Sequence, residues 1–546
     1  MSDLTVAAVV GETLARLGAD LVFGVVGSGN FHVTNALVAN GARFVATRHE
    51  GGAATAADAY ARVSGRPGIV SVHQGCGLTN AMTGIAEAAK SRTPMLVLAA
   101  EPASSALRSN FRVDQDALAH AVGAVSERVH GPASAVADTT RAWRIAVHER
   151  RTVVLNLPLD VQAAPAEPAT VPPAPAVQAP RASDDAVTAL AHLLRGARRP
   201  VFIAGRGALA ARAELEALAG ACGALLATSA AAKALFQGNE WNLDVSGGFA
   251  TPVAAELIAD SDVVVAWGAS LTMWTTRHGA LISPDAMVVQ VDTDASALGG
   301  HHRIDLGVIG DAAFSAVAVR AALPGEREGY RTDAVRGKLR DQGRWRDVAF
   351  DDDGDDTHVD PRALTIALDD LLPPERVVAV DSGNFMGYPS MFLTVPDHRG
   401  FCFTQSFQSI GLGLASTLGA ALASPGRLPV AACGDGGFLM GIAELDTVRR
   451  LGIGMLVVVY NDEAYGAEVH HFGPDGHPLD TVRFPETDIA AIARGYGCAA
   501  VTVRKPEDLD LVGEWLAGPR DVPMVVDAKV AAGKPAWWLE EAFRGH

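Results

Sequence analysis

Two predicted strands in the last third of the chain run into residues that could hold a metal ion and a phosphate group. After residues 429–432 comes a run of glycines around one carboxylate: Gly434, Asp435, Gly436 and Gly437. After residues 456–460 comes Asn461. Asp435 offers a carboxylate oxygen, Asn461 an amide oxygen and the following turn a backbone carbonyl, and such all-oxygen sets suit Mg²⁺. The glycines let the backbone approach a phosphate closely, so the pattern predicts a metal-bridged diphosphate ligand.

The two strands must end on the same edge of one sheet for these residues to meet. Twenty-four residues separate Gly436 from Asn461, which is enough for one crossover helix. Because crossovers between parallel strands are right-handed, both strand ends would then lie on one edge. Ligands of such sheets bind beyond the carboxyl ends of the strands.

Short apolar runs alternate with longer Ala/Leu-rich stretches along the whole chain. The runs that predict strands are residues 68–72, 94–98, 200–204, 262–266, 377–380, 428–432 and 455–460. Continuous apolar strands between helices are typical of parallel sheets that are covered on both faces. We therefore expect an α/β protein with three doubly wound domains and mainly parallel sheets.

Two segments divide the chain into three blocks. Residues 163–182 contain six prolines and predict an extended connector. Residues 324–358 include a dense acidic run and are expected to form a solvated second connector. The blocks that remain are 1–162, 183–323 and 359–535.

Composition limits the class of protein. The 546 residues include 62 Asp and Glu against 45 Lys and Arg, a formal charge of −17. This balance argues against nucleic acid or an anionic membrane as the main partner. Five cysteines without a CxxC pair favour a reduced cytoplasm. Neither a signal peptide nor a membrane span is expected.

The glycine-rich Asp435 segment followed by Asn461 resembles the metal–diphosphate motif of the thiamine diphosphate (ThDP) enzyme family, in its acetolactate synthase, benzoylformate decarboxylase and pyruvate decarboxylase-like branch. The resemblance covers the whole chain and implies a pyrimidine-binding, a middle and a diphosphate/Mg-binding domain in the three blocks. It implies that Asp435 and Asn461 bind Mg²⁺ through side chains and Glu463 through its backbone carbonyl. The residues that the resemblance implies in cofactor binding are Gly383, Asn384, Phe385, Ile410, Gly434, Gly436, Gly437, Asn461, Ala464 and Tyr465.

The same resemblance implies that Glu50 activates the cofactor. In the family one Glu hydrogen-bonds the aminopyrimidine ring, so that the cofactor's own nitrogen acts as the base. An apolar environment would favour such proton sharing. The alternative is an exposed Glu in the first turn of a helix. Ile410 resembles the apolar residue that bends the cofactor into a V, although it could be an ordinary core residue.

Four residues are candidates for substrate chemistry. Ser28 and His73 match polar active-site positions of benzoylformate decarboxylase. Glu468 lies three residues after Tyr465, as a catalytic Glu does in pyruvate decarboxylase. Gln115 resembles the Gln of a Phe-Gln-Glu loop in acetolactate synthase, while His73 or Glu468 could instead have a structural role.

The resemblance implies non-oxidative decarboxylation of a small 2-oxo acid through an enamine intermediate, by a ThDP- and Mg-dependent carbon–carbon lyase. An acetolactate synthase-like carboligase is the alternative, and residues 205–207 of the middle block resemble a loop that holds FAD or ADP, although FAD is not expected to be required. A non-catalytic nucleotide- or ThDP-binding regulatory protein is the third hypothesis. The family also implies a homodimer or homotetramer with active sites between subunits.

Overall fold

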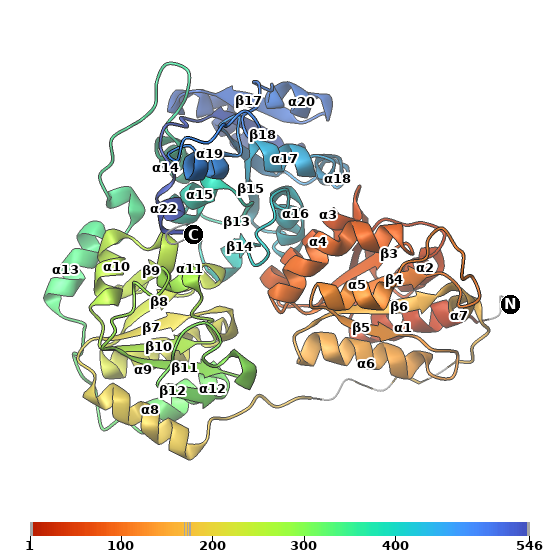
Figure 1. The fold of residues 1–546 in the computed structure, drawn as a ribbon, viewed down its shortest axis with the longest axis horizontal. Helices are drawn as coiled ribbons and strands as arrows, with labels where there is room; N and C mark the ends of the chain where they lie inside the picture. The colour runs from red at the N-terminus through yellow and green to blue at the C-terminus, as the bar shows by residue number, and fades with distance from the viewer. Residues whose placement is uncertain (1–3, 169, 172, 174–175, 543–546) are drawn as a thin grey trace.

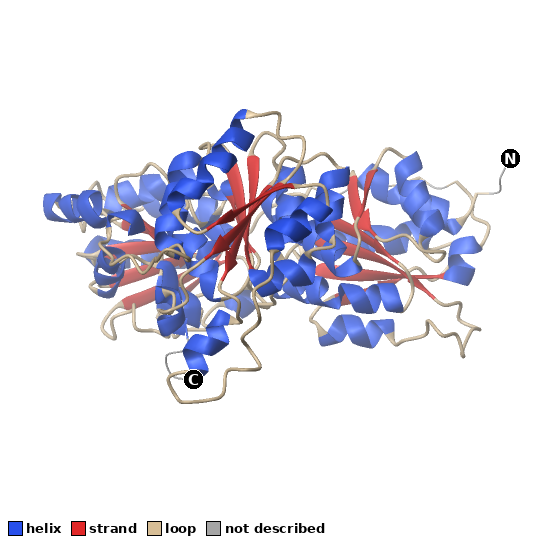
Figure 2. Ribbon diagram, turned by 90° about the horizontal axis from the view of Figure 1, so that it is seen from above, coloured by secondary structure: helices blue, strands red, loops and turns tan. Residues whose placement is uncertain are grey.

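Three α/β units make up the chain, and each is built on one sheet (Figure 1). The computed structural model describes residues 4–168, 170–171, 173 and 176–542. Each sheet has six strands, all paired in parallel, and helices lie on both sides of the sheets (Figure 2). The predicted α/β class with three doubly wound sheets is therefore confirmed. Among the described residues, no helix has the length and apolar character needed to cross a membrane.

The N-terminal sheet has the strand order β2-β1-β3-β4-β6-β5. Its strands are β1 (Leu21–Gly24), β2 (Arg43–Ala46), β3 (Gly68–Val72), β4 (Met95–Glu101), β5 (Val125–Arg128) and β6 (Thr152–Pro158). The helices of this unit are α1 (Val6–Leu17), α2 (Phe31–Ala39), α3 (Glu50–Ser64), α4 (Cys76–Lys90), α5 (Gln115–Ala121), α6 (Ala135–His148) and α7 (Leu159–Ala163). Strands β3 and β6 are buried along their whole length, because helices cover both faces of the sheet.

The middle sheet has the order β12-β11-β10-β7-β8-β9. Its strands are β7 (Pro200–Ala204), β8 (Leu225–Thr228), β9 (Asn242–Val245), β10 (Val263–Trp267), β11 (Met287–Asp292) and β12 (Leu306–Ile309). The helices are α8 (Asp184–Gly196), α9 (Arg212–Cys222), α10 (Pro252–Ala259), α11 (Met273–Thr276), α12 (Ala312–Ala321) and α13 (Asp333–Gln342).

The C-terminal sheet has the order β14-β13-β15-β16-β18-β17. Its strands are β13 (Arg376–Val380), β14 (Phe401–Phe403), β15 (Leu428–Gly434), β16 (Leu456–Asn461), β17 (Ala499–Val503) and β18 (Met524–Lys529). The helices are α14 (Pro361–Leu371), α15 (Gly387–Phe392), α16 (Gly413–Ala423), α17 (Asp435–Gly441), α18 (Glu444–Arg450), α19 (Gly466–Phe472), α20 (Ile489–Gly495), α21 (Asp510–Ala517) and α22 (Trp537–Ala542). Strands β13, β15 and β16 are neighbours, so the loops that follow them meet at one edge.

The first connector runs from the N-terminal to the middle unit (Figure 1). After α7, its described residues up to 182 contain no helix, in agreement with the expected extended segment, whereas residues 169, 172 and 174–175 lie outside the described residues. The second expected connector differs, because it contains helix α13. Val335 and Leu339 of α13 are buried in the core of the middle unit. Their spacing of four residues puts both on one helical face, a signal that the nearby acidic run obscured.

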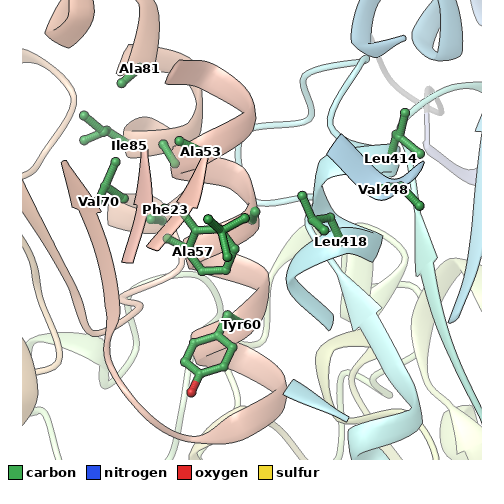
Figure 3. Packing of buried hydrophobic residues seen from close by; sticks show 14 of the residues in the cluster. Phe23, Ala53, Ala57, Tyr60, Val70, Ala81, Ile85, Leu414, Leu418 and Val448 are labelled. Atoms are coloured by element: carbon green, nitrogen blue, oxygen red, sulfur yellow. The ribbon is translucent and has the colours of Figure 1, made fainter. Parts of the chain in front are cut away.

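Helices α3 and α16 join the N-terminal and C-terminal units. Ala53 and Ala57 on one side face Leu414 and Leu418 on the other, in a single buried cluster (Figure 3). A Cβ added to Gly419 of α16 would lie 2.0 Å from the carbonyl oxygen of Ala56. The small residues of both helices therefore allow their backbones to come close together, which brings the two candidate cofactor-binding units into direct contact.

Candidate cofactor and active site

The predicted metal ligands lie at the carboxyl ends of two adjacent strands. Gly434 pairs with Tyr460, so Asp435 and Asn461 each follow this last register position directly. Asp435 is 9% exposed and opens α17, while Asn461 is 2% exposed. The Asn461 Nδ2 donates a hydrogen bond of 2.8 Å to Asp527 Oδ1. That bond fixes the orientation of the Asn461 amide, whose oxygen accepts a bond of 3.3 Å from Glu463 N and keeps a second lone pair for a metal.

Buried carboxyl groups collect at this edge. Burial raises the pKa of Asp435 to about 6. Burial, and secondly the charge of Asp435, raises the pKa of Asp462 to about 8. A divalent cation would stabilise the charged form of these carboxyl groups, so the donor set fits Mg²⁺. Across the described part of the chain, no group of three or more His, Cys, Asp or Glu side chains could hold a metal ion by itself. A metal at this edge would therefore also need the Asn461 amide, a backbone carbonyl and oxygens of the ligand.

At the glycines that follow β15, any side chain would collide with neighbouring residues. A Cβ on Gly436 would lie 2.7 Å from the ring of Tyr465, and one on Gly437 would lie 2.4 Å from Asp381 Oδ2. Tyr465 packs edge-on against Phe484, with ring centroids 4.9 Å apart. A pocket of about 340 Å³ opens here between α17 and the segment after β16. It is lined by Asp435, Gly436, Leu439, Met440, Asn461, Glu463, Tyr465, Phe484, Pro485 and Thr487.

The loop after β13 reaches the same edge. Gly383 has φ +138°, a conformation that other residues rarely adopt. Asn384 Oδ1 accepts a hydrogen bond of 3.0 Å from Ala536 N, and the Asn384 carbonyl accepts one of 2.8 Å from Trp538 Nε1. Phe385 stacks on Tyr460 of β16, with ring centroids 5.4 Å apart. The C-terminal segment thus holds the loop that was predicted to bind the cofactor.

Asp381 is a positioning residue that we did not predict. Its buried carboxylate accepts hydrogen bonds from the backbone amides of Gly411 at 3.0 Å and Leu412 at 3.1 Å. These bonds hold the turn that presents Ile410, which is half-buried. The available signal was its place directly after the apolar strand 377–380. The role of Ile410 beneath a cofactor remains a prediction.

Glu463 has a partner that the sequence did not suggest. Its backbone has φ +55°, and its carbonyl accepts a hydrogen bond of 2.8 Å from Phe484 N. The adjacent Ala464 forms an isolated antiparallel bridge with Arg483. One lone pair of the Glu463 carbonyl is therefore occupied, and a metal would have to use the second one.

Glu50 is the first residue of α3 and follows β2, which ends at Ala46. It is 8% exposed, and its Oε2 accepts a hydrogen bond of 3.1 Å from Asn80 Nδ2. A Cβ on Gly77 would lie 3.4 Å from Glu50 Oε1. The side chain is therefore buried against α4 rather than exposed on a first helical turn. The sequence pattern did not indicate Asn80 as a hydrogen-bond partner of Glu50.

His73 and Ser28 come together near Glu50. Ser28 Oγ lies 3.3 Å from His73 Nε2, and His73 Nδ1 lies 3.0 Å from the Gln74 carbonyl. A proton on Nδ1 would satisfy that carbonyl and leave Nε2 to accept from Ser28. The ring of Phe111 meets the His73 ring edge-on at 5.0 Å. A Cβ on Gly77 would lie 3.1 Å from His73 Cβ and 3.4 Å from Glu50 Oε1, so Gly77 lies between the two residues.

Gln115 and Glu468 lie in different surroundings. The Gln115 side chain is 1% exposed: its Oε1 accepts from Gly75 N at 3.1 Å and its Nε2 donates to Asn156 Oδ1 at 2.8 Å. Both ends are thus occupied, and Gln115 braces the loop before α4. Glu468 lies on α19 in the C-terminal unit, where no hydrogen bond or ion pair with another described residue involves its side chain. The structure does not bring it together with His73.

Arg206 marks the loop of the middle unit that resembles a nucleotide site. Burial, and secondly the nearby positive charges of Arg62 and Arg150, lowers its pKa to about 9. Arg206 itself is half-buried, and the carboxylates of Asp58 and Glu87, which pair with Arg62, act on its pKa in the opposite direction.

Comparison with known proteins assigns the class. Residues 4–122 match "Thiamine pyrophosphate enzyme, N-terminal TPP binding domain", residues 187–320 match the central domain and residues 381–528 match the C-terminal TPP binding domain. The chain belongs to the thiamine pyrophosphate enzyme family. The family predicted from the glycine-rich Asp435 segment is therefore confirmed. The matched TPP-binding domains include β1 to β4 of the N-terminal sheet and β14 to β17, with most of β18, of the C-terminal sheet.

Individual relatives cover nearly the whole chain. A protein of Pseudomonas aeruginosa named "Probable 2-ketoarginine decarboxylase" is 32% identical over 527 residues, 93% of this chain and 90% of that protein. The sulfoacetaldehyde acetyltransferase of Castellaniella defragrans is 27% identical, over 91% of this chain and 88% of its own length. The acetolactate synthase large subunit of Parasynechococcus marenigrum is 28% identical, over 97% and 88%.

Proposed function

We propose that this protein is a ThDP- and Mg²⁺-dependent carbon–carbon lyase that decarboxylates a small 2-oxo acid without oxidation. The observation that carries the proposal is the buried Glu50 at one sheet edge, together with the paired Asp435 and Asn461 at another. The relative named as a 2-ketoarginine decarboxylase supports decarboxylation as the reaction.

The residues of the C-terminal edge would hold the cofactor. Asp435, the Asn461 amide oxygen and the second lone pair of the Glu463 carbonyl would bind Mg²⁺. Gly436 and Gly437 would let the backbone approach the diphosphate, since neither site tolerates a Cβ. ThDP supplies an electron sink for the pair of electrons that CO₂ leaves behind.

The residues of the N-terminal edge would share and transfer protons. The Glu50 carboxylate would share a proton with the aminopyrimidine ring, and its buried position favours such sharing over full solvation. His73 Nε2, which is oriented by Ser28 and the Gln74 carbonyl, would move a proton at the reacting carbon. Glu468 is a second candidate for proton transfer, from the opposite edge.

A homodimer would bring the two edges together, with each active site between subunits. Large apolar side chains remain exposed near both edges in the single chain: Val26, Phe31, Leu107, Phe111, Met440, Tyr465 and Phe484. Apolar residues gathered at functional edges support burial by a partner copy. A homotetramer and a cytoplasmic location remain parts of the proposal.

A carboligase is the second candidate, because relatives named acetolactate synthase and sulfoacetaldehyde acetyltransferase also cover most of the chain. The half-buried guanidinium of Arg206 would suit an anionic group in the middle unit, such as the diphosphate of FAD. A flavin absorbance spectrum of the purified protein, with analysis for acetoin-type products, would favour this candidate. We expect no flavin to be required.

The test is a panel of 2-oxo acids with ThDP and Mg²⁺, including pyruvate, benzoylformate and 2-ketoarginine, followed by CO₂ release and aldehyde analysis. The proposal predicts stoichiometric CO₂ and aldehyde for at least one acid, and loss of both with Glu50→Gln. Ligated products without free aldehyde would select the carboligase. ThDP binding without any turnover would select a non-catalytic, regulatory protein.

A further inference from the structure

The main chain just before Glu50 is held by a carboxylate from the C-terminal unit. Glu444 Oε1 accepts hydrogen bonds from Arg48 N at 3.1 Å and from His49 N at 2.9 Å. Glu444 is 2% exposed, and its Oε2 accepts a further bond of 2.7 Å from Thr447 Oγ1. Hydrogen bonds to a buried carboxylate are strong, and an amide left without one would be costly.

The space around Glu444 is closely fitted to this contact. A Cβ on Gly52, in the first turn of α3, would lie 2.4 Å from Glu444 Oε1. Helix α18 also reaches β2 directly, because Arg450 Nη2 donates a bond of 2.7 Å to the Ala46 carbonyl. The peptide groups that lead from the end of β2 into Glu50 are therefore held by α18.

We propose that Glu444 is a positioning residue for Glu50. By holding the amides of Arg48 and His49, it sets the backbone direction at which α3 starts, and with it the direction of the Glu50 side chain toward Asn80. This inference rests on the proposed function of Glu50. It adds a residue of the C-terminal unit to the machinery that orients the activating carboxylate of the same chain.

The test compares Glu444→Gln with Asp446→Asn, a matched carboxylate-to-amide change on the same helix. Asp446 pairs with the side chains of Arg48 and Arg450, at 2.5 Å and 2.7 Å, but not with the main chain before Glu50. Exchange of the C2 proton of bound ThDP with solvent deuterium, followed by NMR, reports the orientation of Glu50. Amide hydrogen exchange of residues 46–52 without cofactor reports the local backbone.

We expect Glu444→Gln to slow C2 exchange about tenfold or more, since small misplacements of a catalytic group have effects of this size. Its ThDP affinity should stay within about threefold of the wild type, because the metal and diphosphate contacts are elsewhere. Its 46–52 amides should exchange faster, whereas Asp446→Asn should match the wild type in all three measurements. Thr447→Val, which removes the Oγ1 donor to Glu444 and the acceptor of a 3.1 Å bond from Arg450 Nη2, should have an intermediate effect if Glu444→Gln does not fold.

Wild-type C2 exchange and wild-type protection of residues 46–52 in folded Glu444→Gln, or in Thr447→Val where it is the variant measured, would overturn the inference. A wild-type protein that binds ThDP but shows no C2 exchange would instead overturn the proposed function. In that case faster amide exchange in Glu444→Gln would still support the backbone contact. The two failures are therefore distinguishable.

Discussion

In the proposed function, Glu50 and the residues proposed to bind the metal have separate tasks, so single substitutions should separate chemistry from binding. Glu50→Gln keeps the shape of the side chain and its contact with Asn80 but removes the shared proton. We expect kcat to fall by about 10²- to 10⁴-fold, the range that positioned acid–base groups contribute. The ThDP affinity, measured by calorimetry, should change little. A parallel loss of affinity would show that Glu50 acts mainly in binding.

His73 and Ser28 should act as a unit in the chemical step. We expect His73→Ala to lower kcat by about 10²-fold or more and Ser28→Ala to lower it less, because Ser28 only orients Nε2. The double variant should resemble His73→Ala, since effects of residues that act through one another are not additive. Steady-state kinetics with the preferred 2-oxo acid would check this. Fully additive losses would show that Ser28 and His73 act independently, against the prediction.

At the scale of single residues, the sequence revealed the groups that follow strands but not their long-range partners. Asp435 and Asn461 follow recognisable apolar strands, so local pattern was sufficient to propose them. Glu50 was proposed from the family resemblance, because the strand before it, β2, is short and largely exposed. The bond between Arg48 and Glu444 joins residues 396 positions apart, and no local periodicity reports it. The hydrogen bonds of Gln115 with Gly75 and Asn156 are likewise long-range contacts. They give Gln115 a role in supporting the loop before α4, which the sequence did not indicate.

The α3–α16 contact is the element pair on which the N-terminal and C-terminal units meet. Gly419→Ala would place its Cβ 2.0 Å from the Ala56 carbonyl oxygen. We expect it to lower the free energy of unfolding by about 1–3 kcal/mol, as overpacking in a tight interface does. Thermal and urea unfolding of the full chain would measure the change.

Gly337 provides the control for this prediction. It also lies in a helix, α13, and nothing lies within 4 Å of a Cβ added there. We expect Gly337→Ala to stabilise the chain by about 0.4–1 kcal/mol, through loss of unfolded-state freedom. Equal effects of the two alanines would contradict the close helix packing seen in Figure 3.

Elements were predictable where the apolar run was continuous, and strands 68–72 and 200–204 match β3 and β7 in full. Helix α13 was missed because its exposed face is strongly charged and only Val335 and Leu339 face the core. The segment of residues 482–484 after α19 was missed for a different reason. It pairs with the backbone around Ala464, and such isolated bridges leave no side-chain pattern in a sequence.

At the scale of the whole molecule, the proposal places each active site between two chains. Glu50→Gln and Asp435→Asn should each be inactive alone. Co-refolded or co-expressed together, they should regain about a quarter of wild-type activity, because half of the random dimers would carry one intact site of two. Activity assays of mixed and separate variants, with size-exclusion chromatography, would measure this. No recovery in verified mixed dimers would place Glu50 and Asp435 of one chain in the same site.

Calorimetric titration of the protein with ThDP, first with Mg²⁺ and then with EDTA in excess, tests whether the proposed site binds the cofactor through a divalent ion. We expect saturable binding that requires the divalent ion and is lost in Asp435→Asn, since in the proposed site the ion would be held by Asp435 and Asn461 and would in turn hold the diphosphate. Equal binding without the metal, or no binding in its presence, would contradict the proposed site.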